Sequence, residues 1–443
     1  MKFKNIVFIA LCLLFNLMLL SCSDDDNNSS NNNSTNSSAN NFSLDIIEDY
    51  TPEFNSKDYI KTELNDPEAL FVDGINRFTI NLFQYASQNN INAKRNTFVS
   101  GYSVEQVLAM LSNGACDETL NEILNVFGFK FTLDDFNNYN RVISNLLCSQ
   151  SDNTKLEIAN ALWMNDKTKV YRSFISNVDN FYDTDVLPLD FSSEESAKTV
   201  NTWCKEKTHG LIESLFHEGP LSGNILITNA IYFDANWLYK FNEKNTHNDT
   251  FINSDGSHSD IEMMEHKKSS PMSVINLEKM DMVNIPFSDR FGMVAALPHE
   301  NEDLLSCIKS MNISDWNYFS YQRQLQSTLT NVKLQMPKFE IDMIGGLVPI
   351  LEKFGVKMLF SDNSDLSKMS PDVKSIGMLC QTSKLKVFEE GVEATAVTYT
   401  SDTSTGTNPQ TKDITIRFDR PFIITIYDTK TGIIMFMGCV NNL

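Results

Sequence analysis

Side chains that could carry out chemistry are scattered along this sequence rather than grouped in a known catalytic pattern. The chain has no G-x-S-x-G, P-loop, H-E-x-x-H or G-x-G-x-x-G segment, and these are the usual signatures of nucleophile, phosphate, zinc and dinucleotide sites. The six histidines show no metal-type spacing and are His209, His217, His247, His258, His266 and His299. We therefore expect no enzyme, cofactor or metal site, with a Cys204–His209 thiolate dyad as the alternative.

One cysteine stands where covalent attachment of lipid is expected. Lys2 and Lys4 precede an apolar run that ends in Leu19-Leu20-Ser21-Cys22, which is typical of a bacterial lipoprotein signal peptide. We expect residues 1–22 to be this signal and Cys22 to anchor an exported protein in the outer membrane; an ordinary secretory signal is the alternative. The acidic stretch Ser23-Asp24-Asp25-Asp26 is similar to a tag for the cell surface, and favours a surface or extracellular location.

Composition separates a tether from a folded body. Hydrophobic residues make up 42% of the 443 residues, and Phe alone occurs 30 times, which requires a sizeable core. Residues 27–41 are nearly all Asn and Ser, a composition that does not fold. We assign residues 23–55 to a disordered tether and 56–443 to a single, monomeric domain. The net charge of −21 excludes nucleic acid as a partner.

Six cysteines remain in the body. Their irregular spacing includes no C-x-x-C pair, which argues against a zinc or redox motif. We expect buried free thiols at Cys116, Cys148, Cys204, Cys307, Cys380 and Cys439.

Helices are predicted in the first part of the body. Apolar residues recur at helical spacing at Phe71, Ile75, Phe78, Leu82 and Tyr85. Ser103 and Gln106 have the spacing of a capping box at the start of a second helix, which runs out near Gly114. A third helix on Leu120 and Ile123 should stop at Gly128.

Strands are predicted in the second part. Residues 225–233 are apolar on both faces, which suits a central strand. Alternation from Val332 to Met336 and from Lys384 to Val387 predicts half-buried strands, and two apolar runs, 422–427 and 433–440, predict a C-terminal hairpin. Helices followed by sheets indicate an α+β fold.

Several segments, in order, resemble those of the serpin family of protease inhibitors. They are Phe98-Val99-Ser100-Gly101-Tyr102-Ser103, Leu156-Glu157-Ile158-Ala159-Asn160-Ala161-Leu162-Trp163, Val200-Asn201-Thr202-Trp203, Thr208-His209-Gly210-Leu211-Ile212, Asn229-Ala230-Ile231-Tyr232-Phe233, Met336-Pro337-Lys338-Phe339 and Phe418-Asp419-Arg420-Pro421-Phe422. The resemblance implies large mixed sheets, about eight or nine helices and an exposed reactive loop, about 389–412. It also implies that opening of the main sheet is controlled at the shutter and breach by Ser100, Ser103, Asn229, Trp237 and Gln381.

The segment that bears on function is similar to the serpin hinge, at the base of the reactive loop. It consists of Glu389, Glu390, Gly391, Val392, Glu393, Ala394, Thr395, Ala396, Val397 and Thr398. Small and β-branched residues without Pro can become a strand inside a sheet, and Gly391 is expected to give the pivot its conformational freedom. The resemblance implies a suicide mechanism: a protease cuts the loop, forms an acyl-enzyme, and is carried along as the hinge inserts into the main sheet.

The family's spacing gives two positions for the cut. Counting from the hinge places it at Thr405 and Gly406, and counting back from Phe418 places it nearer Gln410 and Thr411. Both choices present small or uncharged residues, which suit an elastase-like or subtilisin-like serine protease, with a papain-like cysteine protease as a further possibility. The only basic residue of this region is Lys412, so trypsin is expected to be inhibited poorly.

Three residues depart from the family pattern or raise a question about insertion. Gly101 and Gln381 stand where the family usually has Pro and His. Asp402 shares a strand face with Val392, and burial of its carboxylate would hinder complete insertion. The alternatives to an inhibitor are a non-inhibitory binding lipoprotein of the same fold, and a surface lipoprotein that captures nutrients such as glycans.

Overall fold

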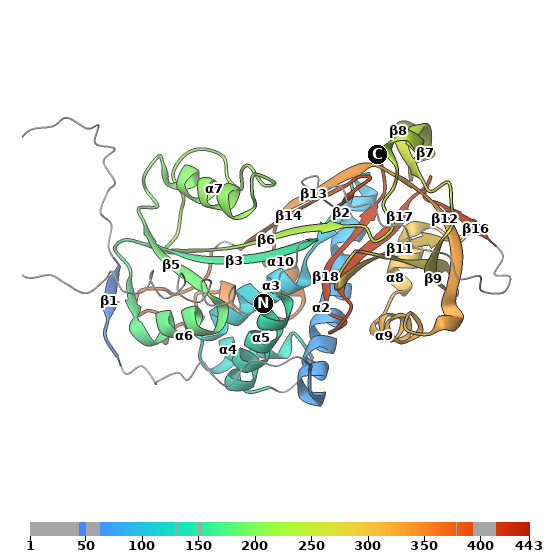
Figure 1. Cartoon of the computed structure of the whole chain (residues 1–443). Coiled ribbons are helices and arrows are strands. Elements are labelled where there is room, and N and C mark those ends of the chain that lie inside the picture. Colours follow the sequence, from blue (N-terminus) through green and yellow to red (C-terminus); the bar gives the residue numbers. More distant parts are fainter. Residues whose placement is uncertain (1–43, 50–62, 129–130, 149–152, 378, 393–412) are drawn as a thin grey trace, which may run out of the picture. The chain divides into compact units, whose positions relative to one another are not determined.

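Two large β-sheets and the helices around them form the folded body of the chain (Figure 1). The computed structural model describes residues 44–49, 63–128, 131–148, 153–377, 379–392 and 413–443, all of which belong to one unit. Nine α-helices lie within these described residues. They are α2 (Asp66–Asn92), α3 (Gly101–Ser112), α4 (Asp117–Asn125), α5 (Leu133–Leu147), α6 (Arg172–Tyr182), α7 (Ser196–Lys207), α8 (Leu304–Ser310), α9 (Ile313–Gln322) and α10 (Val348–Lys353).

The first sheet has six strands and both parallel and antiparallel pairs. Its order is β13 (Phe339–Gly346), β14 (Cys380–Val387), β15 (Gly391–Val392), β6 (Ile225–Asn236), β3 (Thr154–Asn165) and β5 (Thr184–Leu189). The first nine residues of β6 are all buried. This confirms the prediction of a central strand that is covered on both faces.

The second sheet has ten strands. Its order is β2 (Thr97–Val99), β18 (Ile434–Val440), β17 (Phe422–Asp428), β11 (Phe291–Pro298), β10 (Met280–Pro286), β9 (Ser270–Asn276), β12 (Leu329–Pro337), β8 (His258–Glu265) and β7 (His247–Ile252), and β16 (Ile414–Arg417) pairs with β12 in parallel. Strands β17 and β18 form the predicted C-terminal hairpin. The mixed sheets and the helices confirm the predicted α+β fold class.

Helices cover both faces of the six-stranded sheet. Helix α3 packs against β6 and β18, and α2 packs against α3, β2 and β18. Helix α7 lies on the opposite face of the six-stranded sheet from α3 (Figure 1). Trp163, Val200, Trp203 and Leu226 belong to a second, smaller hydrophobic cluster beneath α7.

The predicted helices form, although one starts differently. In α2 the side chains of Phe71, Ile75 and Leu82 are fully buried, as their spacing predicts. The capping box expected at Ser103 and Gln106 is wrong. Ser100 is the N-cap of α3, and its hydroxyl oxygen accepts a hydrogen bond from the Ser103 backbone N–H. Because Ser100 caps the helix, the Ser103 hydroxyl is available for a hydrogen bond to β6 of the six-stranded sheet, which is described below.

A short strand lies inside the stretch assigned to the tether. Strand β1 (Asp45–Ile47) pairs in parallel with β4 (Lys169–Tyr171), so residues 44–49 are part of the body rather than of the tether. Within the described residues, no helix has the length and apolar character needed to span a membrane.

The five cysteines whose side chains the structure describes are free thiols, as expected, but not all are buried; the side chain of Cys380 lies outside the described part. Cys204, Cys307 and Cys439 are buried, whereas Cys116 is half-buried and Cys148 is exposed. The sequence pattern around these two cysteines is no different from that around the others, so exposure could not be predicted from it.

Candidate functional site

The hinge begins directly after β14, where the chain turns back into the sheet. The turn is closed by a hydrogen bond of 3.1 Å from the Phe388 N–H to the Gly391 carbonyl oxygen. Val392 then pairs with Val387 of β14 on one side and with Ala235 of β6 on the other, both antiparallel. The Val392 side chain is 1% exposed. The first residue of the predicted inserting segment is therefore already inside the sheet.

Strands β6 and β14 flank β15 on its two sides, and we call this pair the frame. Both strands of the frame can pair with an inserted strand that runs antiparallel to them. They run parallel to each other, because Ile227 of β6 bridges Leu379 in the parallel sense, just before β14. Strand β15 runs antiparallel to both. A chain that continued beyond Val392 could thus form ladder hydrogen bonds with β6 and β14 at once. It would have to separate Ile227 from Leu379 to reach the end of the frame.

Gly391 is needed for a different reason from the one predicted. Its φ does not lie in the left-handed region that favours glycine. Instead, a Cβ atom at this position would lie 2.0 Å from the carbonyl oxygen of Ala235. Gly391 therefore permits close approach of two backbones rather than a special turn conformation.

Two carboxylates hold the hinge to its surroundings. The buried Glu389 accepts a hydrogen bond of 2.7 Å from the Thr246 hydroxyl and lies 3.2 Å from the Lys338 Nζ. Glu390 forms an ion pair of 2.5 Å with Lys240. Burial by itself raises the pKa of Glu389, but the Thr246 hydrogen bond and Lys338 outweigh it and hold the pKa below its usual value.

Trp237, the predicted breach residue, completes this attachment. Its indole N–H donates to the Phe388 carbonyl oxygen at 2.9 Å, and its backbone N–H donates to the Glu390 carbonyl oxygen, also at 2.9 Å. The indole ring stacks on Phe287 with a centroid distance of 4.6 Å. Trp237 therefore fixes both the backbone before the hinge and the packing beneath it.

The predicted shutter residues come together at the start of α3. The Ser103 hydroxyl donates to the Asn229 side-chain oxygen of β6. The Asn229 amide donates to Asn160 of β3 at 2.6 Å, and the Asn160 amide donates to the Tyr182 carbonyl oxygen at 2.9 Å. These groups are buried. Together they connect strands β6 and β3 to helix α3 and to the end of helix α6.

The two departures from the family pattern can be placed. At Gly101 a Cβ atom would lie 2.0 Å from the Thr79 hydroxyl oxygen of α2, so the close packing of α2 on α3 requires glycine here. Gln381 lies in β14, where its backbone pairs with Gly345 of β13. Its side chain is outside what the structure describes.

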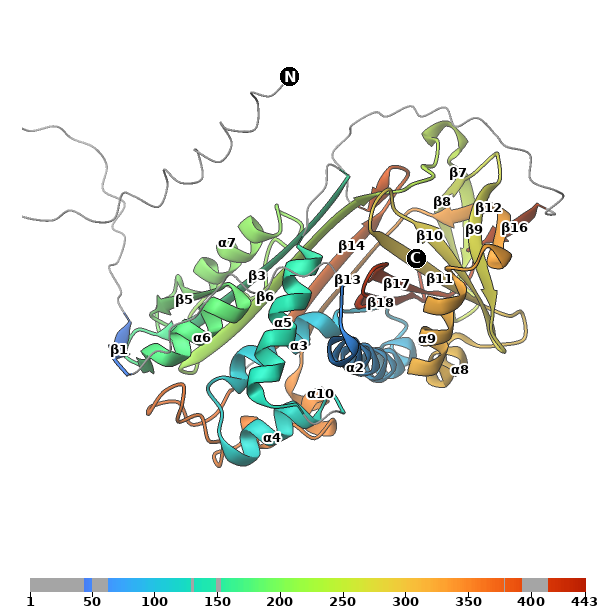
Figure 2. The same cartoon turned by 60° about the horizontal axis from the view of Figure 1, so that its bottom comes forward.

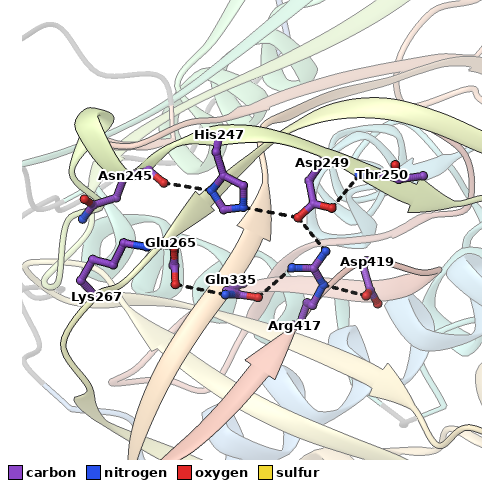
Figure 3. A network of polar contacts seen from close by, with 9 residues as sticks. All are labelled: Asn245, His247, Asp249, Thr250, Glu265, Lys267, Gln335, Arg417 and Asp419. Carbon is purple, nitrogen blue, oxygen red and sulfur yellow. Dashed lines mark hydrogen bonds and ion pairs between the residues drawn. The ribbon is translucent and has the colours of Figure 1, made fainter.

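After residues 393–412, which lie outside the described residues, the chain forms β16, and Arg417 attaches this strand to the body. The Arg417 guanidinium donates to Asp249 at 2.6 Å, to Asp419 at 2.8 Å and to Gln335 at 2.9 Å. Figure 3 shows this arginine at the centre of a polar network that reaches His247 through Asp249. The described segments on either side of residues 393–412 are thus both held by charged contacts with the body.

Part of the predicted site lies outside the described residues. These positions are Glu393, Ala394, Thr395, Ala396, Val397, Thr398, the scissile-bond candidates Thr405, Gly406, Gln410 and Thr411, and the lipidation site Cys22. Sequence reasoning missed the partners of the hinge, Thr246, Lys240 and Lys338. Only the presence of Lys338 in a family-like segment could have drawn attention to it.

The geometry argues against the Cys204–His209 dyad. Burial raises the pKa of the Cys204 thiol to about 12, which keeps it protonated. The His209 ring contacts Glu157 at 2.7 Å and packs on Tyr232, and neither contact involves the Cys204 thiol. Among the described side chains, no group of three His, Cys, Asp or Glu could hold a metal ion.

Comparisons with known proteins agree with this architecture. The family model described as "Serpin (serine protease inhibitor)" matches residues 73–443. Iripin-1 of Ixodes ricinus is 31% identical over 362 residues, which cover 79% of this chain and 90% of that protein. Serpin B3 of Homo sapiens is 27% identical over 388 residues, which cover 82% of this chain and 96% of that protein.

Solved structures match as well. The native-state crystal structure of Tengpin, a thermophilic serpin, has a TM-score of 0.75 at 25% identity, and the match covers 90% of this chain and 98% of that one. Because the family model and these relatives span most of the chain, including the hinge and the shutter, the chain belongs to the serpin family.

Proposed function

We propose that the protein is a suicide-substrate inhibitor of an extracellular protease, in which the hinge inserts between β6 and β14. The observation that carries this proposal is Val392, already paired on both sides in the sheet. Membership in a family of serine protease inhibitors supports the general activity. The inhibitor supplies no catalytic group, since the chemistry belongs to the protease.

The covalent step follows from the protease's own reaction. Its nucleophilic oxygen or sulfur attacks a carbonyl carbon of the loop and forms an acyl-enzyme, while the peptide C–N bond breaks. The new amino group takes up the proton and remains on the fragment that contains β16. The fragment that ends in the acyl bond is then separated from β16 and carries the protease at its end, and it can extend β15 before water completes hydrolysis.

The register of β15 indicates how insertion would proceed. Continued from Val392, it places Ala394 opposite Phe233 and Leu385, and Thr398 opposite Asn229 and Gln381. Small side chains at the first positions fit beside the large apolar residues of the frame. Thr398 would then reach the level of the shutter, where a hydroxyl can join the amide network.

Target specificity is proposed from the loop sequence. Cleavage at Thr405 or Gly406, or alternatively at Gln410 or Thr411, presents small or uncharged residues. These suit the S1 pocket of an elastase-like or subtilisin-like serine protease, and a papain-like cysteine protease is a further target class.

We also propose a location from the first residues of the sequence. The lipobox-like segment ending in Cys22 supports a lipid anchor in the outer membrane, and Asp24 to Asp26 support exposure on the cell surface. The folded body would act there as a monomer.

The decisive experiment incubates residues 42–443 with elastase and examines the products on a denaturing gel and by mass spectrometry. We expect a covalent band at the summed mass and a released peptide that starts between Gly406 and Thr411. Elastase with a blocked active-site serine is the control and should give no such band. Loop cleavage without a covalent band, also with subtilisin-like and papain-like enzymes, would favour the non-inhibitory binding protein.

A further inference from the structure

The segment before α2 docks on the body through specific contacts. In the parallel pairing of β1 with β4, Asp45 lies opposite Lys169 and Ile47 lies opposite Tyr171. Leu44 and Ile46 pack, partly buried, against the main hydrophobic core. This segment therefore combines a backbone ladder with apolar contacts, as an edge strand of a folded sheet does.

Two carboxylates of the same segment bind the start of α6. Glu48 accepts hydrogen bonds from the Arg172 guanidinium at 2.7 and 3.2 Å. Asp49 accepts from the Ser173 backbone N–H at 2.8 Å and from the Ser173 hydroxyl at 2.5 Å. The N-cap residue of α6, Tyr171, provides no side-chain cap, so Asp49 supplies the anionic cap that a helix N-terminus favours.

The strand that receives this segment is itself held firmly. The Tyr171 N–H donates to the Met369 carbonyl oxygen at 3.0 Å, and the Lys169 N–H donates to the Asp372 carboxylate at 3.0 Å. Val170, between them, is fully buried. A chain attached to β4 is therefore attached to the core of the body.

The docking point lies far from the reactive-loop end. Both views place β1 and α6 at one end of the body, and β16, β7 and β8 at the other (Figures 1 and 2). The hinge belongs to the second end, because Glu389 is hydrogen-bonded to Thr246, which directly precedes β7.

We propose that residues 44–49 are a docking strap that fixes the anchor peptide to the α6 end of the body, so that the anchored protein presents its reactive-loop end away from the membrane. This inference rests on the proposed N-terminal anchor, and it goes beyond the inhibitory function. The strap decides where the tether joins the body, and thereby which end faces outward.

The strap also shortens the predicted tether. With the strap docked, the tether is residues 23–43; without it, the free chain extends to Asn65, the N-cap of α2. For a coil of the predicted kind, the root-mean-square length would rise from about 25 Å to about 36 Å. The junction would also move from α6 to the start of α2. Both changes would relax the orientation of the body.

The test uses residues 23–443 with an N-terminal hexahistidine tag, bound to vesicles that contain a nickel-chelating lipid. This arrangement replaces the natural lipid and involves no protease, so its outcome is independent of Cys22 acylation and of protease trapping. A donor dye is introduced, through a genetically encoded azide residue, at the exposed Lys167 beside β4 or at the exposed Lys244 near the hinge. An acceptor dye is placed in the lipid.

We expect strong energy transfer from position 167 and weak transfer from position 244. In the variant Ile46→Asp, Glu48→Ala, Asp49→Ala, this difference should fall at least twofold, and the Ser173 amide hydrogen, which Asp49 accepts, should exchange faster. The matched control, Glu118→Ala with Asp134→Ala, removes two exposed carboxylates elsewhere and should change neither quantity.

Equal transfer from the two positions in the natural sequence would overturn the proposal, as would an undiminished difference in the strap variant. Unchanged far-ultraviolet circular dichroism of the variant shows that it folds. If the variant fails to fold, the two labelled forms of the natural sequence still decide the question of orientation.

Discussion

Val392 of the hinge is paired with Ala235 of β6 while the chain is intact. In the proposed mechanism, the hinge has therefore taken up the first position of insertion before any protease cuts the loop. The remaining steps of the proposed insertion would require small side chains, release of the Ile227–Leu379 bridge and a freed loop end. Each of these requirements can be altered by a single substitution.

The first prediction concerns the residue already in the sheet. Val392→Glu should turn the inhibitor into a substrate, because a carboxylate would have to be buried at a position that is 1% exposed. We expect the covalent complex with elastase to decrease about tenfold or more while loop cleavage continues, since 1.4 kcal/mol corresponds to a factor of ten. Gel densitometry measures both. Val392→Thr, of similar shape, should retain most of the complex, and equal yields for the Glu and Thr variants would contradict the insertion model.

The second prediction concerns the shutter. Asn229→Ala would leave the Ser103 hydroxyl and the Asn160 side-chain oxygen without their buried partner. We expect the free energy of unfolding to fall by about 1–3 kcal/mol, the usual penalty for unpaired buried polar groups. Urea denaturation measures it. The exposed Asn301→Ala is the matched control and should leave stability unchanged. A loss at position 229 no larger than at 301 would show that the network contributes nothing.

The third prediction concerns pH. Glu105 is fully buried in α3, and burial raises its pKa to about 8, although Asn140 and Gln106 donate hydrogen bonds to it. Because the folded-state pKa exceeds the unfolded value of 4.5, this residue favours folding most below pH 4.5. That stabilisation is lost progressively as the pH rises to about 8, by roughly 1.4 kcal/mol per unit.

The neutral variant Glu105→Gln should lack this pH dependence. We expect its free energy of unfolding, relative to the natural sequence, to increase between pH 5 and pH 8 and then to stay level. Urea denaturation of both proteins at pH 5, 6.5, 8 and 9 gives the difference. Parallel curves for the two proteins would show that Glu105 does not titrate in this range.

The fourth prediction concerns the far end of the inserting strand. In the register of β15, Asp402 would lie opposite Ile225, the first residue of β6, and opposite Gly377, before β14. Its carboxylate would then stand at the edge of the frame and slow the last step. Asp402→Ala should lower the number of inhibitor molecules consumed per protease trapped, measured by titrating elastase. Ser404→Ala is the control, and equal values for the two variants would remove Asp402 from the mechanism.

The fifth prediction concerns specificity. Trypsin should be inhibited poorly, because Lys412 is the only basic residue of the region 399–412 and it lies beyond both expected cleavage positions. Titration of trypsin activity, with mass spectrometry of the products, is the measurement. Efficient stoichiometric trapping with cleavage after Lys412 would contradict the proposed specificity and move the scissile bond.

The local sequence pattern predicted those parts of the fold in which the residue types of a single segment determine its secondary structure and burial. The apolar residues from Ile225 onward form a central strand because both faces are covered, and Val392 is buried because it is apolar and β-branched. Where a contact between two segments that are distant in the sequence determines the role of a residue, the local pattern did not predict that role. The reason for Gly391 lies in the Ala235 carbonyl oxygen, and the cap of α6 comes from Asp49. No local spacing reveals such a partner.

In the proposed mechanism, strands β6 and β14 would accept an extended backbone with small side chains rather than one particular molecule. The chain's own hinge has the advantage of effective concentration, which lies in the millimolar range for short connections. If the protein is anchored as proposed, a densely covered membrane would raise the local concentration of other copies of the same segment toward this range. Under the proposed mechanism and location, surface density as well as sequence would therefore govern whether insertion occurs within one molecule or between two.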